Sequence, residues 1–443
     1  MSTHVVLGLG VTGQAVLRAL TAHGDGAVAV DDRPTDAARA VADELGVPLV
    51  EAPDPSVLAT LVAEADAVVP SPGVPDHHPI FAAATEAGVP VLSEFDLAAR
   101  WDSRPLVAIT GTNGKTTVTE LVRAMLSASG RRAVAVGNTE VPLVAAIDDP
   151  AIEVFVVEAS SFRLLHSQHF VPQVGTWLNV APDHLDNHAS FDAYVAAKAR
   201  LWAHQSPTQI AIGNADDPVV AEHLSRARAR HETFGLGGGA DNRLEGDRLR
   251  LAGGEELARV GELTRAFPHD IANALAAGAS ALHGGGTVEG AHAALVAFGG
   301  LPHRVTLVGE AGGVRWYDDS KATAPHATRA AIRGFESVVL IAGGRNKGLD
   351  LGELAAEADH LRAVVAIGEA GPDVVMAFDG RRPVELAGSM DDAVAAAARA
   401  ARPGDVVLLS PACASFDWYG SYGERGDDFA RAVGELLGES ARR

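Results

Sequence analysis

Eight residues, Thr110 to Thr117 (TGTNGKTT), constrain the fold of this chain more than any other stretch. An apolar run, Leu106 to Ile109, precedes them, and a helical pattern from Val118 to Leu126 follows. This order predicts a strand, a glycine turn and a helix, which together aim backbone N–H groups and a helix N-terminus at an anion. Lys115 adds a positive charge for the terminal phosphates, and the threonines after it offer hydroxyls to Mg²⁺. The stretch predicts nucleotide triphosphate binding; the simpler alternative is a glycine turn that closes a βα unit.

The rest of the chain alternates apolar runs typical of strands with alanine-rich helical runs, which predicts an α/β fold with parallel sheets. With 443 residues, two or three domains are expected. We predict three: a Rossmann-like domain at 1–97, a central P-loop domain with a parallel or mixed sheet at 98–300, and a second Rossmann-like domain at 301–443. In the last, strands are expected at 314–317, 338–342, 364–367 and 406–409.

The first domain opens with a second glycine-rich turn. Gly8 to Gly13 follows a short strand, and the acids Asp31 and Asp32 end the next strand about 20 residues later. This is the dinucleotide-binding fingerprint. A later strand runs into Ser71-Pro72-Gly73, a stiff turn at a strand's carboxyl end, where ligands of open α/β sheets collect.

Composition narrows the classes of partner. The formal net charge of −21 disfavours general nucleic-acid binding, because a phosphate backbone would be repelled. No apolar run is long enough to cross a bilayer, and the N-terminus shows no secretion signal. A single cysteine, Cys413, excludes an intrachain disulfide and fits a reducing cytosol, and we expect it to be a packed, inert thiol. We expect a cytoplasmic protein without a membrane span, and a monomer.

One lysine lies on the apolar face of a predicted helix. Ser190 can cap a helix beginning at Phe191, and at 100° per residue Lys198 falls in the middle of its apolar stripe. A lysine there either snorkels, with its stem packed and its amine in water, or is a buried amine available as a nucleophile or for modification. The pattern alone favours the snorkelling lysine.

Two further candidates follow apolar runs. Glu158 ends a buried strand beside the phosphate loop, where a carboxylate can hold Mg²⁺, or it is an ordinary acid at a strand end. His184 lies in a loop, 183–188, with two acids and two histidines, which is either a cation site or a solvated turn. In the third domain, three strand ends carry polar loops at 318–323, 343–348 and 410–417, which together predict an anion site at that sheet's carboxyl edge.

Taken together, these segments resemble the Mur ligase family over essentially the whole chain, and its glutamate-adding type in particular. The most specific marks are the short spacing between Gly111 and Gly114 and the motifs at 158–162, 183–186 with Lys198, 300–304, 319–323 and 409–415. The chain departs from the family pattern at Glu140, Asp270 and Tyr422.

The resemblance implies an ATP-dependent ligase of peptidoglycan synthesis, and through it a role in cell wall formation, cell shape and division. ATP would phosphorylate the carboxylate of UDP-N-acetylmuramoyl-L-alanine, and the amine of D-glutamate would attack the acyl phosphate. L-Glutamate, or another amide ligation of the Mur or folylpolyglutamate type, remains the alternative. Closure would occur at hinges near 95–100 and 300–304.

The resemblance also implies roles for individual residues. Lys115 and the loop amides would hold ATP phosphates, Thr116 and Glu158 one Mg²⁺, and His184 with a carbamate on Lys198 a second. The implied ATP contacts are Gly111, Thr112, Asn113, Gly114, Lys115, Thr116, Thr117, Asn273, Arg304, Asp319 and Lys321. The implied UDP-substrate contacts are Val11, Thr12, Asp31, Asp32, Ser71, Pro72, Gly73, Asn138 and Ser160. The implied glutamate contacts are His184, Thr323, Lys347, Ser415, Phe416 and Tyr422.

Two other classes of protein remain as alternatives. A nicotinamide dehydrogenase would explain Gly8 to Gly13 and Asp31, but it leaves the phosphate loop and the Lys198 helix without a role. A nucleotide-binding regulator without activity would explain the phosphate loop, but the combination of Lys115, Glu158, His184 and Lys198 argues against it. In the ligase interpretation, Gly8 to Gly13 cradles a UDP diphosphate.

Overall fold

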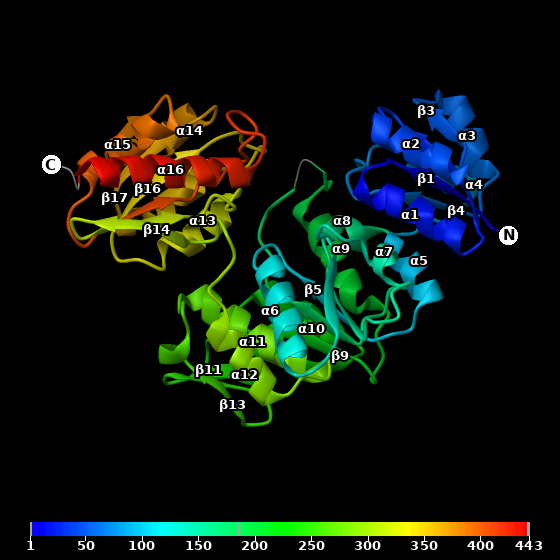
Figure 1. The fold of residues 1–443 in the computed structure, drawn as a ribbon, viewed down its shortest axis with the longest axis horizontal. Helices are drawn as coiled ribbons and strands as arrows, with labels where there is room; N and C mark the ends of the chain where they lie inside the picture. The colour runs from blue at the N-terminus through cyan, green and yellow to red at the C-terminus, as the bar shows by residue number, and fades with distance from the viewer. Residues whose placement is uncertain (1, 185–186, 441–443) are drawn as a thin grey trace. The chain divides into compact units, whose positions relative to one another are not determined.

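The computed structural model describes residues 2–184 and 187–440. They form two compact units: one holds residues 2–180, 187–266 and 270–298, and the other holds 181–184, 267–269 and 299–440. Three sheets flanked by helices confirm the predicted α/β class (Figure 1).

The first sheet is entirely parallel, with the order β3-β2-β1-β4. Its glycine turn after β1 leads directly into α1, so the N-terminus of α1 faces the carboxyl ends of the strands. The strands are β1 Thr3–Leu7, β2 Gly26–Asp31, β3 Leu49–Glu51 and β4 Ala67–Pro70. The helices are α1 Val11–Ala22, α2 Asp36–Leu45, α3 Pro55–Ala63 and α4 Pro79–Ala87, drawn in blue in Figure 1.

Helix α5 (Glu94–Trp101) connects the first sheet to the second and includes the segment 95–100, where a hinge is predicted. Residues 95–100 form one continuous helix, and 94–98 are buried. Asp96 fixes this helix to the second region, because its Oδ1 accepts hydrogen bonds from the backbone N–H groups of Gln168 (2.9 Å) and His169 (2.6 Å). The predicted hinge at 95–100 thus falls within a helix that Asp96 ties to the second region, and movement about this segment stays a prediction.

The second sheet has nine strands in the order β13-β12-β11-β10-β9-β8-β5-β7-β6. Its strands are β5 Leu106–Thr110, β6 Ala133–Gly137, β7 Val154–Glu158, β8 Val174–Trp177, β9 Ile210–Asn214, β10 Arg230–Gly235, β11 Asn242–Glu245, β12 Arg248–Arg250 and β13 Glu256–Arg259. Its helices are α6 Lys115–Ala128, α7 Leu143–Ala146, α8 Ser161–Leu165, α9 Phe191–Ala203, α10 Pro218–Arg226, η1 Val260–Glu262, α11 Pro268–His283 and α12 Val288–Ala297.

Strand β5 lies inside this sheet, and its side chains alternate between two cores. Val107 and Ile109 pack in the same core as residues of α6, α11 and α12. Ala108 faces the opposite core, which includes Leu201 and Trp202 of α9. Since β7 and β8 pair with β5 on either side in parallel register, the ends of all three strands reach one edge of the sheet.

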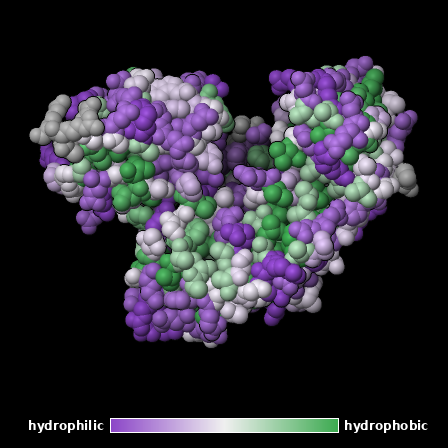
Figure 2. Space-filling model, viewed as in Figure 1, coloured by the Kyte–Doolittle hydropathy of each residue, from purple (hydrophilic) through white to green (hydrophobic). Residues whose placement is uncertain are grey.

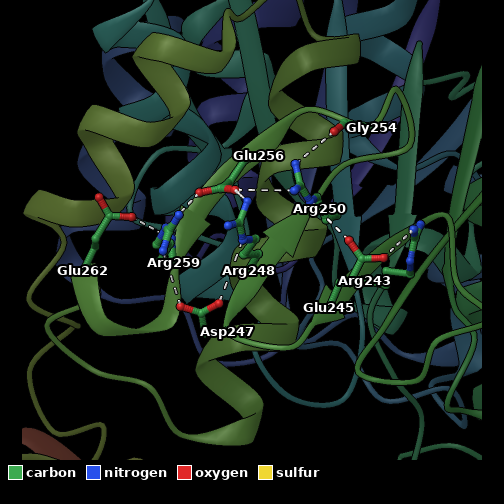
Figure 3. A network of polar contacts seen from close by, with 9 residues as sticks. All are labelled: Arg243, Glu245, Asp247, Arg248, Arg250, Gly254, Glu256, Arg259 and Glu262. Atoms are coloured by element: carbon green, nitrogen blue, oxygen red, sulfur yellow. Dashed lines mark hydrogen bonds and ion pairs between the residues drawn. The ribbon is translucent and has the colours of Figure 1, made fainter.

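The far end of this sheet consists of the charged antiparallel strands β11, β12 and β13. Figure 3 shows the alternating arginines and acids of β11, β12 and β13, including Arg248 NH1 to Glu256 Oε2 at 3.0 Å. Such exposed pairs contribute at most about 1 kcal/mol each to stability. Their charges instead discourage another strand from pairing with the edge strand β13.

The third sheet has the order β14-β15-β19-β16-β17-β18, and β14 is antiparallel to β15. All four predicted strands are present, whereas β14 and β18 were not foreseen. The strands are β14 Thr306–Ala311, β15 Val314–Asp318, β16 Val338–Gly343, β17 Leu361–Ile367, β18 Val384–Leu386 and β19 Val406–Leu409. The helices are α13 Pro325–Ile332, η2 Leu351–His360, α14 Gly371–Phe378, α15 Met390–Ala400 and α16 Tyr422–Ser440.

The surface drawn in Figure 2 mixes hydrophilic and hydrophobic residues. No helix within residues 2–184 and 187–440 is long and apolar enough to cross a membrane.

The packing of α1 on its glycine turn generates a stability prediction. A Cβ on Gly13 would lie 2.0 Å from the carbonyl oxygen of Gly8, whereas a Cβ on Gly10 would have no atom within 4 Å. We expect Gly13→Ala to lower the free energy of unfolding by about 1–3 kcal/mol, because α1 must move away from β1. Gly10→Ala is the matched control and should stay close to wild type in denaturant-induced unfolding. Equal stability of the two variants would contradict the prediction.

Candidate active site

The phosphate loop is already folded around its backbone N–H groups. The side-chain Oδ1 of Asn179, just after β8, accepts hydrogen bonds from the backbone N–H groups of Thr112 (3.1 Å) and Asn113 (2.8 Å). Lys115 Nζ donates to the carbonyl oxygens of Gly111 (2.9 Å) and Thr112 (3.1 Å). The loop is therefore held in shape by its own lysine and by a neighbouring strand end. Sequence reasoning missed Asn179, whose only signal is its place after the apolar run ending at Leu178.

Gly114 brings a second helix to the loop. It precedes α6 with φ of +82°, and a Cβ there would lie 2.7 Å from the side-chain oxygen of Asn273 on α11. Glycine is needed both for this backbone conformation and for the close approach. The structure thus brings Asn273, the predicted adenine contact, to the loop that precedes Lys115. Of the two threonines after Lys115, Thr117 is buried and Thr116 is half-buried.

Lys198 is buried beneath the phosphate loop, with 1% of its surface exposed. Its Nζ donates to the carbonyl oxygen of Gly111 at 2.8 Å and lies 4.5 Å from the centre of the Tyr194 ring. The Tyr194 hydroxyl is 3.1 Å from Thr112 Oγ1 of the same loop. The snorkelling alternative is therefore wrong: the amine points into the protein and contacts the loop. The predicted helix and its Ser190 cap are confirmed.

Glu158 ends β7 at the register position of Ile109 on β5, and is 2% exposed. Its Oε1 accepts a hydrogen bond from Asn138 Nδ2 at 2.8 Å. Its Oε2 is buried, and no residue in the described part of the chain donates a hydrogen bond to it. A buried carboxylate oxygen left open next to a phosphate loop is suited to a hard cation such as Mg²⁺.

Only part of the loop 183–188 lies within the described residues, so the cation site predicted there stays a prediction. Leu185 and Asp186 lie outside the described residues. His188 is 2% exposed, with its Nε2 at 3.0 Å from Ser161 Oγ and its ring stacked on Phe162. His184 groups with the second unit, so its distance from Lys198 stays a prediction. Within residues 2–184 and 187–440, no group of three or more His, Cys, Asp or Glu side chains is arranged to hold a metal.

The predicted UDP side is built around the α1 N-terminus. Asp31 Oδ2 accepts from the backbone N–H of Leu9 (2.6 Å), and Ser71 Oγ donates to the carbonyl oxygen of Gly8 (2.5 Å). Both side chains therefore shape the glycine turn. Thr12 Oγ1 accepts a hydrogen bond from Arg163 (2.9 Å), a residue that sequence reasoning missed. Val11 and Asp32 are exposed, as are Gly73 and Asn138. Ser160 caps α8 by accepting from the backbone N–H of Arg163.

The second unit holds the remaining predicted residues at the carboxyl edge of the third sheet. Lys321 Nζ lies 4.9 Å from the centre of the Tyr422 ring, and Lys347 Nζ is 3.4 Å from Thr323 Oγ1. Ser415 is buried and Phe416 is 63% exposed. These positions belong to three different loops, as the sequence predicted for an anion site at this edge.

Asp319 is a buried carboxyl group at the same edge, 7% exposed. Burial raises the pKa of Asp319 to about 7, although a hydrogen bond from Ser410 (2.7 Å) and the positive charge of Arg304 act in the opposite direction. Cys413 is 1% exposed, and burial raises the pKa of its thiol to about 12, which agrees with a packed, inert cysteine.

Family comparisons agree with this architecture. The descriptions that match are "Mur ligase MurD-like, N-terminal domain" over residues 2–93, "Mur ligase middle domain" over 109–281 and "Mur ligase, glutamate ligase domain" over 303–413. A UDP-N-acetylmuramoylalanine–D-glutamate ligase of Frankia casuarinae is 45% identical and covers 97% of this chain and 93% of the relative. The ligase of that name from Desulfosudis oleivorans is 41% identical, over 99% and 97%.

Solved structures show the same fold at low identity. A pseudomurein peptide ligase type C from Methanothermus fervidus superposes with a TM-score of 0.63 and 18% identity, covering 98% of this chain and 100% of that one. The UDP-N-acetylmuramate–alanine ligase MurC from Thermotoga maritima gives a TM-score of 0.59 and 19% identity, over 98% and 100%.

The three sheets and the phosphate loop define a multidomain α/β protein that binds a nucleotide. With its family matches and near full-length relatives, the chain belongs to the Mur ligase family.

Asp319 generates a pH prediction. The unfolded chain releases this proton near pH 3.8, whereas the folded protein keeps it until about pH 7. Stability of the nucleotide-free protein should therefore fall as pH rises between these values, by roughly 1.4 kcal/mol per pH unit, and then level off. Asp319→Asn should remove this slope in denaturant-induced unfolding measured from pH 4.5 to 8.

Asp405 serves as a control, because its pKa is shifted in the opposite direction from that of Asp319. Burial would raise the pKa of this carboxyl group, but hydrogen bonds, chiefly from Arg362, hold it below its usual value. Asp405→Asn should therefore lose stability at neutral pH and less at acidic pH. An unchanged slope in Asp319→Asn would contradict the assignment.

Proposed function

We propose that this chain is an ATP-dependent ligase that joins the carboxylate of UDP-N-acetylmuramoyl-L-alanine to the amine of D-glutamate in peptidoglycan synthesis. One observation carries the proposal: a phosphate loop, a buried carboxylate at the end of the adjacent strand and a buried lysine all meet at Gly111 and its neighbours. The names of relatives 38–45% identical over nearly the whole chain supply the two substrates.

The proposed reaction first converts the substrate carboxylate into an acyl phosphate, because phosphate is a good leaving group. The substrate carboxylate attacks the γ-phosphorus of ATP, which forms an acyl phosphate and releases ADP. The amine of D-glutamate then attacks the acyl carbon, phosphate leaves, and the amine gives up a proton as the amide forms. Phosphoryl transfer depends on positioning and charge neutralisation more than on proton transfer.

Residues of the first unit would act on the phosphates. The loop N–H groups and Lys115 would bind the β- and γ-phosphates, with Lys115 exchanging its bonds to loop carbonyls for bonds to phosphate. Thr116 and Glu158 would hold one Mg²⁺, whose charge would offset that of the phosphates. The open oxygen of Glu158 fits this role. Asn273 would meet the adenine from α11.

Lys198, as the carbamate that its neutral amine forms by adding CO₂ and losing a proton, would hold a second Mg²⁺ with His184. A carbamate converts a buried amine into an anionic oxygen ligand, which suits Mg²⁺. Its burial and its contact with Gly111 place it beside the phosphate loop, where such a ligand would be useful. Arg304, Asp319 and Lys321 would contact ATP from the second unit.

The acyl donor and the amine substrate would bind at the remaining sites. The α1 N-terminus, with Val11, Thr12, Asp31, Asp32 and the turn 71–73, would hold the UDP group, and Asn138 and Ser160 the muramoyl part. Glutamate would meet His184, Thr323, Lys347, Ser415, Phe416 and Tyr422. Glycine turns of this kind bind any diphosphate at a helix N-terminus, so no nicotinamide is required.

The deciding experiment is coupled turnover. Phosphate release from ATP should require both UDP-N-acetylmuramoyl-L-alanine and D-glutamate, because the acyl phosphate forms only on the first and is consumed by the second. L-Glutamate in place of D-glutamate should give little product. ATP hydrolysis at full rate without either substrate, or equal product with both enantiomers, would contradict the proposal.

Substitution of Lys198 tests the carbamate. Lys198→Ala should lower kcat by about 100-fold or more, because an oxygen ligand at the phosphate site is lost. Formate or acetate should restore part of the activity by supplying a carboxylate in the vacated space. Arg200→Ala on the same helix is the control. The Arg200 guanidinium donates to the carbonyl oxygen of Ser167 and not to the phosphate loop, so short acids should not raise the activity of this variant. Wild-type turnover in Lys198→Ala would refute the role.

A further inference from the structure

Arg163 joins three segments that are far apart in the sequence. Its guanidinium forms a buried ion pair with Glu94 Oε1 at the start of α5. Its NH2 group donates a hydrogen bond of 2.9 Å to Thr12 Oγ1 in the first turn of α1. Arg163 itself lies on α8, five positions after Glu158. One side chain therefore links the UDP-side helix, the connecting helix and the segment that follows the candidate Mg²⁺ ligand.

This ion pair is costly to bury. The side chains of Arg163 and Glu94 are 6% and 2% exposed, and the guanidinium lies 5.8 Å from the centre of the Phe95 ring. Arg163 Nε is buried and finds no hydrogen-bond partner in the described part of the chain. Removing two charges from water costs about as much as their attraction returns, so stability alone does not account for the pair.

Glu94 belongs with the central sheet and not with the first. Its Oε2 accepts a hydrogen bond of 2.9 Å from the backbone N–H of Val144 on α7. Asp96, two positions later in α5, is bonded to the N–H groups of Gln168 and His169. Of the residues described, Thr12 is thus the only one from the first sheet and its helices that this guanidinium hydrogen-bonds.

The hydrogen bond from Arg163 to Thr12 matters because of where Thr12 lies. Thr12 follows the glycine turn whose N–H groups and helix N-terminus suit a diphosphate. Arg163 also lines a small pocket together with Ser71 and Pro72, two other predicted UDP-substrate residues. The fork of an arginine can satisfy a carboxylate and a hydroxyl at fixed angles, which a lysine cannot.

We propose that Arg163 is a positioning residue that sets the diphosphate-binding turn at a fixed distance from the segment carrying Glu158. This inference rests on the proposed function, because it concerns the UDP-linked substrate of the same site. The Arg163–Thr12 bond holds the α1 N-terminus where the bound UDP group delivers its distal carboxylate to the phosphate loop. An error of about 1 Å in that delivery is costly to rate.

The test uses Arg163→Lys, Thr12→Val and the double variant. Lysine keeps a positive charge beside Glu94, so folding is preserved, and valine has the shape of threonine without its hydroxyl. Each single change should raise KM for UDP-N-acetylmuramoyl-L-alanine by about tenfold. The dissociation constant for this substrate, measured by calorimetry without ATP, should rise by a similar factor. Because the carboxylate is delivered less accurately to the phosphate loop, kcat should fall as well. KM for ATP and for D-glutamate should stay within about twofold. The double variant should be no worse than either single one, because both remove the same bond.

Arg104→Lys is the matched control. Arg104 also pairs with a carboxylate, Asp102, donates to backbone carbonyls and packs over a ring, that of Phe155, but it precedes β5 at the opposite edge of the sheet. The Arg104→Lys variant should have a lower melting temperature and an unchanged KM for the UDP-linked substrate.

Three outcomes would overturn the inference: parallel changes in KM for all three substrates, additive effects of the two single changes, or an equal effect of Arg104→Lys. Failure of the proposed function has a different signature. If the wild type binds the UDP-linked substrate but forms no amide with D-glutamate, the ligase proposal falls, and the dissociation constants still decide the role of Arg163.

Discussion

Parallel pairing of β5 with β7 on one side and β8 on the other is the constraint on which the candidate site depends. It brings three strand ends to one edge, and each contributes a different function. β5 supplies the phosphate loop, β7 supplies Glu158, and β8 is followed by Asn179, whose side chain holds two loop N–H groups in place. The loop is therefore shaped before any ligand arrives, so less conformational entropy is lost on binding.

Beneath this edge, the protein keeps polar groups in a dry interior. Lys198, Tyr194 and Thr112 are all buried, and each contacts the loop or belongs to it. In such surroundings a polar group without a partner is expensive, and electrostatic interactions are stronger than in water. The open oxygen of Glu158 has no hydrogen-bond donor in the described part of the chain, and it lies where a cation would compensate it. The burial of these groups and the open oxygen of Glu158 thus point to the same ligand, a cation beside the phosphate loop.

Local sequence patterns predicted most of the fold and many residues of the candidate site. Strand, glycine turn and helix are defined by neighbouring residues, so Lys115, Glu158 and the cap at Ser190 followed from short stretches. Lys198 shows what local patterns cannot predict. Its helical face was predicted, but whether its amine reaches water depends on which residues pack over it. Asn179 and Arg163 were missed because their partners are 66 and 151 positions away in the sequence. The bonds that Asp96 in the predicted hinge segment makes to Gln168 and His169 are likewise not visible in the local pattern.

The two glycine turns also differ in whether neighbouring or distant segments hold them in place. The turn before Lys115 is held by its own strand neighbours, whereas the turn of α1 depends partly on Arg163, which comes from another sheet's helix. A buried ion pair in which one partner also bonds a third segment adds little net stability, but it tolerates few alternative arrangements. Rotation of α1 would leave the Arg163 guanidinium with a second unsatisfied donor in addition to Nε. The cost of that loss restricts the orientation of the UDP-side turn relative to α8, and hence to Glu158.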